Sequence, residues 1–173
     1  MNSPVPSPGF TQRVIVGVGD LAVSSSPDVI LSTYALGSCI GVVAYDPFIK
    51  VGGMLHLMLP DSTIAPAKAA RQPAMFADTG LPLFLDALTG LKARLGQLRV
   101  YIAGGACMVA GHDPFRIGER NARAVLDLLA RAGCPAPRED TGGFLNRTLH
   151  LEMQNGNITV KTPQAIAHWT LAA

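Results

Sequence analysis

Cys39 is the first residue in this sequence whose type and setting suggest covalent chemistry. It ends the stretch Leu36-Gly37-Ser38-Cys39, which lies between two apolar runs. A tight Gly-Ser turn leaves backbone N–H groups free. A thiol at such a turn could attack a carbonyl carbon while the N–H groups around Gly37 and Ser38 hold the oxyanion. The alternative is a packed cysteine, because a free cysteine often behaves as a small buried hydrophobe.

His56 is the one polar side chain in the apolar run 52–60. Burying an imidazole without a partner is costly, so it either bonds a core carbonyl or serves as the base for a thiol. If residues 42–45 and 54–57 pair as antiparallel neighbours across the turn at 46–50, Cys39 and His56 both lie near one sheet edge. That pairing favours a Cys39–His56 couple.

Thr33 lies six residues before Cys39, and the intervening turn could fold it back toward the same place. Its hydroxyl could accept the second imidazole N–H and fix the histidine tautomer, a role that a carboxylate or amide plays elsewhere. The alternative is an ordinary strand residue, since threonine is a good strand former.

Two other motifs could indicate a dinucleotide-binding site or a pair of catalytic aspartates, but the residues around them do not support either site. Gly17-x-Gly19-x-x-Ala22 resembles a dinucleotide fingerprint, but the following 24–27 stretch, Ser-Ser-Ser-Pro, cannot begin the helix that such a site needs. Asp-Thr-Gly occurs at 78–80 and 140–142, once at an expected helix start and once at an expected turn, so a symmetric aspartic dyad is not supported.

No metal or cofactor is expected. Histidine occurs at four positions without ligand spacing to one another or to cysteine. These are His56, His112, His150 and His168.

The elements that must position these residues are mostly short strands. The expected strands are 14–18, 29–33, 40–44, 51–58, 98–103, 148–153 and 158–161. Residues 61–73 are expected to form a mobile surface loop. An amphipathic helix is expected within 74–95, and a second over 119–132. Pro82 fits the first turn of the earlier helix, so that helix either begins near Gly80 or has a preceding turn that is kinked there.

This pattern predicts an α+β fold in which mixed, largely antiparallel sheets are covered by two main helices. The expected organisation is a single domain over 13–163, with a flexible N-terminal tail at 1–12 and a C-terminal tail at 164–173. A monomer is expected, since no heptad or apolar interface stripe is visible.

Composition excludes several classes of protein. Of 173 residues, 49% are hydrophobic and 15% are charged, with a net charge of +2, so the chain is neither disordered nor built to bind nucleic acid or an anionic membrane surface. No apolar stretch is long enough to insert into a membrane. Three cysteines without a signal-like N-terminus predict a cytoplasmic protein without disulfides.

Taken together, the ordered segments resemble the CheD family of bacterial chemotaxis proteins, from about Val14 to Thr162. The matching segments are Val16-Gly17-Val18-Gly19, Thr33-x-x-Leu36-Gly37-Ser38-Cys39, Gly53-Met54-x-His56-x-Met58-Leu59-Pro60, Ala77-Asp78-Thr79, Ala103-Gly104-Gly105-Ala106-x-Met108, Ile117-Gly118-x-Arg120-Asn121 and Glu139-Asp140-Thr141-Gly142-Gly143. One departure is Asn146, where the family often has glycine before the arginine.

The resemblance implies a fold similar to that of the cytotoxic necrotizing factor toxins, with Cys39, His56 and Thr33 as catalytic residues. It implies a protein-glutamine glutaminase that deamidates glutamines of methyl-accepting chemotaxis receptors, at receptor arrays on the inner face of the membrane. The CheC phosphatase is an implied partner.

The expected mechanism begins with proton transfer from Cys39 to His56, which gives a thiolate–imidazolium pair. Residues 61–73 and the Gly104-Gly105 turn are expected to form the rim that binds substrate. Two alternatives stay open. One is a non-catalytic adaptor that binds receptors or CheC, and the other is additional receptor methylesterase activity, since esters are easier acyl donors than amides.

Overall fold

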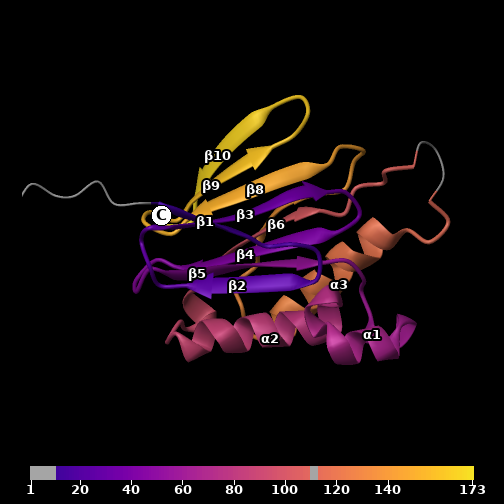
Figure 1. The fold of residues 1–173 in the computed structure, drawn as a ribbon, viewed down its shortest axis with the longest axis horizontal. Coiled ribbons are helices and arrows are strands. Elements are labelled where there is room, and N and C mark those ends of the chain that lie inside the picture. The colour runs from indigo at the N-terminus through magenta and orange to yellow at the C-terminus, as the bar shows by residue number, and fades with distance from the viewer. Residues whose placement is uncertain (1–10, 110–112) are drawn as a thin grey trace, which may run out of the picture.

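Two stacked five-stranded sheets, with helices against the outer face of one, form the architecture (Figure 1). The computed structural model describes residues 11–109 and 113–173. The arrangement is mixed α/β with few helices, compatible with the expected α+β class. The expected N-terminal tail lies mostly outside the described residues.

The first sheet has the strand order β1-β3-β8-β9-β10. Its strands are β1 (Gln12–Ile15), β3 (Val29–Leu36), β8 (Arg147–Glu152), β9 (Asn157–Lys161) and β10 (Ile166–Thr170). Only β1 and β3 run parallel to each other in this sheet, and the other neighbours are antiparallel.

The second sheet has the order β2-β5-β4-β6-β7 and lies between the first sheet and the helices. Its strands are β2 (Asp20–Ser24), β5 (Val51–Leu57), β4 (Ile40–Asp46), β6 (Arg99–Gly104) and β7 (Arg138–Thr141). Every residue of β4 and β5 is buried. This explains why both strands read as nearly continuous apolar runs, because each has a core on both faces.

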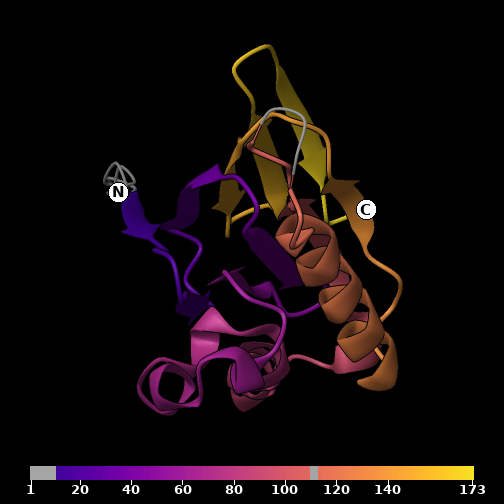
Figure 2. The same ribbon diagram turned by 90° about the vertical axis from the view of Figure 1, so that its right-hand side faces the viewer.

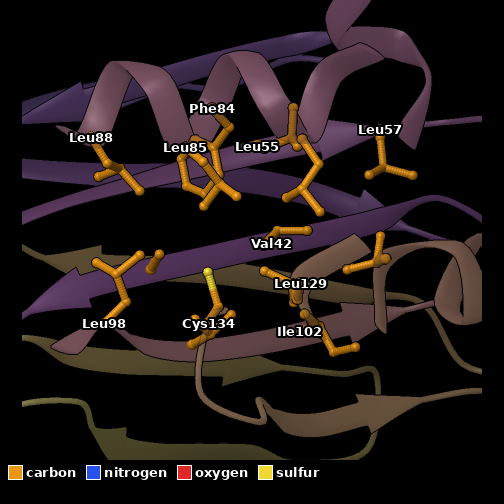
Figure 3. Close-up of a cluster of buried hydrophobic side chains, with 14 of the residues drawn as sticks. Val42, Leu55, Leu57, Phe84, Leu85, Leu88, Leu98, Ile102, Leu129 and Cys134 are labelled. Carbon is orange, nitrogen blue, oxygen red and sulfur yellow. The ribbon is translucent and has the colours of Figure 1, made fainter. Parts of the chain in front are cut away.

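Helices α2 (Ala77–Gly90) and α3 (Ile117–Arg131) cover the second sheet. In Figure 2 the β9–β10 hairpin lies at the opposite end of the molecule from α2. Side chains of α2, including Phe84, Leu85 and Leu88, point at Val42 and Leu55 of the central strands (Figure 3). Within the described residues, no helix is both long enough and apolar enough to cross a membrane.

The expected position of Pro82 was wrong, because α2 begins at Ala77 and Pro82 lies inside the helix rather than in its first turn. Tertiary contacts fix the earlier start: the Ala77 N–H donates to the Leu59 carbonyl at 2.9 Å. Pro82 has no N–H, so it removes one helical hydrogen bond without ending the helix.

The segment expected to be a loop at 61–73 is mostly helical, so that expectation was wrong. It contains η1 (Ser62–Ile64) and α1 (Pro66–Arg71), followed by η2 (Pro73–Met75), and a further short helix, η3 (Leu95–Gln97), precedes β6. The prolines that suggested a loop lie at helix starts, where a missing N–H costs nothing.

Three edge strands, β2, β7 and β10, were not predicted. Edge strands bury little and need no clear apolar alternation: β7 has the sequence Arg-Glu-Asp-Thr. The segment at 164–173, expected to be a tail, contains β10, which pairs with β9. Its Trp169 lies under the Arg138 guanidinium, 3.4 Å from the ring centroid, which ties this strand to β7.

Packing of α2 on the second sheet predicts that alanine substitutions at two adjacent residues differ greatly in their effect on stability. Phe84 is fully buried, whereas Leu83 is 43% exposed. Phe84→Ala should lower the free energy of unfolding by about 3–5 kcal/mol, because it leaves a cavity between helix and sheet. Urea denaturation, monitored by circular dichroism, measures the free energy of unfolding. Leu83→Ala is the matched control, and an equal loss in both variants would contradict the assigned packing.

Candidate active site

Strand register places Cys39 and His56 on one face of the second sheet. β4 and β5 are antiparallel neighbours as predicted, with Gly41 opposite His56. Cys39 precedes Gly41 by two residues, so it lies on the same face of the sheet and diagonal to His56. Cys39 also packs against the core between the two sheets, so the pair faces the first sheet.

Thr33 reaches His56 from the first sheet and orients the imidazole. The Thr33 hydroxyl donates to the Val16 carbonyl at 2.7 Å and lies 2.8 Å from His56 Nδ1. Because a hydroxyl has one proton and Val16 accepts it, Thr33 must accept from Nδ1–H. The neutral imidazole therefore carries its proton on Nδ1 and leaves a lone pair on Nε2.

His56 Nε2 is buried and has no hydrogen-bond partner among the described residues. Burial lowers the pKa of His56, although the Val16 carbonyl and the nearby Asp20 carboxylate oppose the shift. Asp20 lies directly opposite His56 across the β2–β5 pair. The result is a neutral imidazole with a free basic nitrogen, as general-base catalysis requires.

Burial also raises the pKa of the Cys39 thiol, and only its own backbone N–H opposes this shift. Neutral thiol and neutral imidazole are therefore both favoured at rest, in contrast to the thiolate–imidazolium pair of the expected mechanism. Within the described residues no hydrogen bond joins the Cys39 sulfur to Nε2. In this arrangement the thiol would be activated as the proton moves, and not beforehand.

Gly104 and Gly105 hold the Cys39 turn. The Gly105 N–H donates to the Cys39 carbonyl at 2.8 Å. Gly104 has φ of 112°, and a Cβ there would overlap the Cys39 carbonyl oxygen. Only glycine permits this backbone approach. Both glycines thus support the turn, and Gly105 also lines a cavity. Their expected substrate-binding role stays a prediction.

That cavity, of about 530 Å³, lies beside the turn. Its lining includes Gly105, Ala106, Cys107, Arg116 and the strongly exposed Phe144. Cys39 is not among its lining residues. The cavity therefore adjoins the backbone of the turn that carries Cys39.

The other cysteines and histidines lie elsewhere. Cys134 is buried in the helix–sheet core, and Cys107 donates to the Val109 carbonyl at 3.3 Å. His150 lies 2.8 Å from the Ser32 hydroxyl, whereas His112 is outside the described residues. No trio of His, Cys, Asp or Glu side chains within 11–109 and 113–173 is arranged to hold a metal ion.

Reasoning from the sequence missed two groups that act on the Thr33–His56 pair. The Val16 carbonyl fixes the direction of the Thr33 hydrogen bond, and the Asp20 carboxylate acts on the imidazole. A main-chain carbonyl carries no residue-type signal. Asp20 had no signal either, because β2 was not predicted.

Comparison with known proteins agrees with the resemblance found in the sequence. A family model described as CheD chemotactic sensory transduction matches residues 58–162. A protein of Solibacter usitatus (strain Ellin6076), named probable chemoreceptor glutamine deamidase CheD, is 46% identical over 147 residues, which cover 85% of this chain and 87% of that protein. The chain belongs to the CheD family.

Other CheD relatives show the same extent of similarity. Probable chemoreceptor glutamine deamidase CheD 1 of Syntrophus aciditrophicus (strain SB) is 45% identical over 149 residues, covering 86% of this chain and 93% of the relative. CheD 2 of Anaeromyxobacter dehalogenans (strain 2CP-C), with the same descriptive name, is 42% identical over 154 residues, which cover 89% of this chain and 97% of that relative. The family model itself begins after Thr33, Cys39 and His56, so the roles of these residues rest on the geometry.

The pKa directions predict how Cys39 alkylation depends on pH. Because burial raises the thiol pKa, the rate of reaction with iodoacetamide should keep rising beyond the ordinary thiol value of about 8.5. Peptide-level mass spectrometry separates Cys39 from Cys107 and Cys134. A rate that has already levelled off below neutral pH would instead reveal a preformed thiolate–imidazolium pair.

Proposed function

We propose that this chain is a thiol hydrolase that converts glutamine side chains of methyl-accepting chemotaxis receptors to glutamate. The observation that carries the proposal is the pair of hydrogen bonds that Thr33 makes with the Val16 carbonyl and His56 Nδ1, called the Thr33 bridge below. This bridge leaves His56 Nε2 unprotonated, buried and on the same sheet face as Cys39. The names of the CheD relatives, probable chemoreceptor glutamine deamidases, support the choice of substrate.

In the first half of the reaction, His56 Nε2 takes the Cys39 thiol proton as the sulfur attacks the glutamine carboxamide carbon. The carbonyl oxygen becomes an oxyanion, which the N–H groups of Ser38 and Cys39 stabilise. The imidazolium then gives its proton to the departing nitrogen. Ammonia leaves and a thioester remains on Cys39.

In the second half, the neutral imidazole removes a proton from water, which attacks the thioester carbon. Collapse of this intermediate releases the glutamate side chain and returns the proton to the Cys39 sulfur. Because burial lowers the pKa of His56, its basic form persists below the ordinary imidazole value of about 6.5. Activity is therefore lost only as the pH falls through that lowered pKa.

Exposed apolar side chains next to the site fit a protein substrate. Met58 lies two residues beyond His56, and both Met58 and Met108 are substantially exposed. Met108 lies against Gly37 of the nucleophile turn, since a Cβ at Gly37 would approach the Met108 side chain to 2.8 Å. We assign these residues, with the Gly104-Gly105 turn and the 61–73 helices, to the rim that meets a receptor helix.

The proposal extends to the setting of the reaction. We assign the layered sheets to the cytotoxic necrotizing factor-type cysteine hydrolase fold, and the protein to the cytoplasm at receptor arrays. It acts as a monomer with the CheC phosphatase as a regulatory partner. Receptor methyl esters serve as secondary substrates, because an ester is an easier acyl donor than an amide.

Deamidation through Cys39 is tested directly on a receptor. A purified receptor cytoplasmic fragment, incubated with this protein, should gain the mass difference between a carboxamide and a carboxylate and release ammonia. Intact-mass spectrometry should show this conversion with the wild-type protein and no conversion with the Cys39→Ala variant. A folded wild-type protein that binds several receptors without converting them would overturn the proposal in favour of a non-catalytic adaptor.

The Thr33 bridge is tested by removing only its hydroxyl. Thr33→Val keeps the shape of the side chain but loses both hydrogen bonds, so kcat should fall by about 10²-fold as the imidazole loses its orientation. Thr33→Ser keeps the hydroxyl and should retain most activity. Thermal denaturation controls for folding. Equal activity of the Val and Ser variants would remove Thr33 from the mechanism.

A further inference from the structure

Asn121 is a fully buried polar residue near the start of α3. Its side-chain nitrogen donates two hydrogen bonds, one to the Ser38 carbonyl at 2.9 Å and one to the Met58 carbonyl at 2.8 Å. Because both partners are carbonyl oxygens, the amide must present its NH2 group to them, which fixes its orientation. One side chain thus joins the nucleophile turn to the chain that leaves the histidine strand.

The Ser38 bond completes a series along the turn. The Gly37 carbonyl accepts from the Ala106 N–H at 2.8 Å, and the Cys39 carbonyl accepts from the Gly105 N–H at 2.8 Å. Three consecutive carbonyls are therefore held by donors from the segment after β6 and from α3. Only the middle one, that of Ser38, is held by a side chain.

Holding a carbonyl also aims the N–H on the other side of the same peptide. The peptide unit is planar and, among the described residues, always trans, so the N–H of the following residue points opposite to the carbonyl. The Ser38 and Cys39 N–H groups must then point away from the donors. Neither has an acceptor among the described residues.

We propose that Asn121 is a positioning residue that holds the Ser38–Cys39 peptide so that the Cys39 N–H serves as an oxyanion donor. This inference rests on the proposed thiol hydrolase function. Asn121 does not touch the reacting atoms and acts through the backbone. Its second bond, to Met58, fixes the same peptide relative to the end of β5, two residues beyond His56.

The fit of α3 against the turn leaves little room for another arrangement. A Cβ at Gly118, three residues before Asn121, would overlap the Gly105 carbonyl oxygen, so the helix start lies directly on the backbone that holds Cys39. At this distance an aspartate would offer no donor to either carbonyl, and an alanine would leave both without one.

The test separates reactions that form an oxyanion from one that does not. Iodoacetamide alkylates Cys39 by displacement at a saturated carbon, whereas a small activated ester, p-nitrophenyl acetate, acylates it through a tetrahedral oxyanion. In Asn121→Ala and Asn121→Asp, the rate of acylation and the kcat for deamidation should both fall by about 10- to 10²-fold. This is no larger than the loss of about 10²- to 10³-fold that follows removal of a whole oxyanion donor. The alkylation rate and KM should stay within about twofold of the wild type, because neither involves the oxyanion.

Val125→Ala is the matched control, since Val125 is fully buried one turn along the same helix but lies in the helix–sheet core. It should lower thermal stability while leaving the ratio of acylation to alkylation unchanged. A parallel loss of alkylation and acylation in the Asn121 variants, or an equal change of this ratio in Val125→Ala, would overturn the proposal. So would unchanged acylation in a folded Asn121 variant.

A measurement on the wild-type protein keeps the proposal testable if the Asn121 variants do not fold. A peptide with a glutamate semialdehyde side chain should form a hemithioacetal with Cys39, and the Cys39 amide proton should then shift downfield in the NMR spectrum. An unshifted Cys39 amide in that adduct would contradict the assignment. Because the ester and the aldehyde need no receptor, failure of this inference is distinguishable from failure to deamidate a receptor.

Discussion

The single proton of the Thr33 hydroxyl is the constraint on which the candidate site depends. It is donated to the Val16 carbonyl, which leaves the oxygen able only to accept from His56 Nδ1. The free lone pair of the imidazole is thereby assigned to Nε2, on the sheet face that also carries Cys39. Since Thr33 and His56 belong to different sheets, this hydrogen bond exists only when the two sheets are stacked.

The layered fold supplies both the stacking and the desolvation. Leu55 and Leu57 of β5 point into the helix–sheet core, and strand alternation therefore turns His56 toward the other sheet. Burial there favours the neutral imidazole and the neutral thiol. Such a site would hold its base ready without an ion pair in the apolar interior, whose desolvation would be costly.

Much of this arrangement could be predicted from local sequence. The apolar runs of β4 and β5 and the short turn between them gave the right antiparallel pairing, and the periodicity of α3 gave its position within two residues. Edge strands could not be found in this way. β7 and β10 bury too little apolar surface to leave a pattern, and each is defined by its partner strand. The short helices between residues 62 and 75 were hidden because Pro66 and Pro73 lie at permitted first positions.

The sequence by itself determined the residue types, the spacing that puts Cys39 and His56 on one sheet face, and membership of the CheD family. Those features follow from local alternation and from an ordered set of short motifs. Only the tertiary structure decided the direction of the Thr33 hydrogen bond, the burial that favours the neutral forms of Cys39 and His56, and the link from Asn121 to Ser38 and Met58. The physical reason is that each depends on a carbonyl or on burial supplied by a distant segment, and neither a main-chain acceptor nor a desolvated environment is written in the type of any single residue.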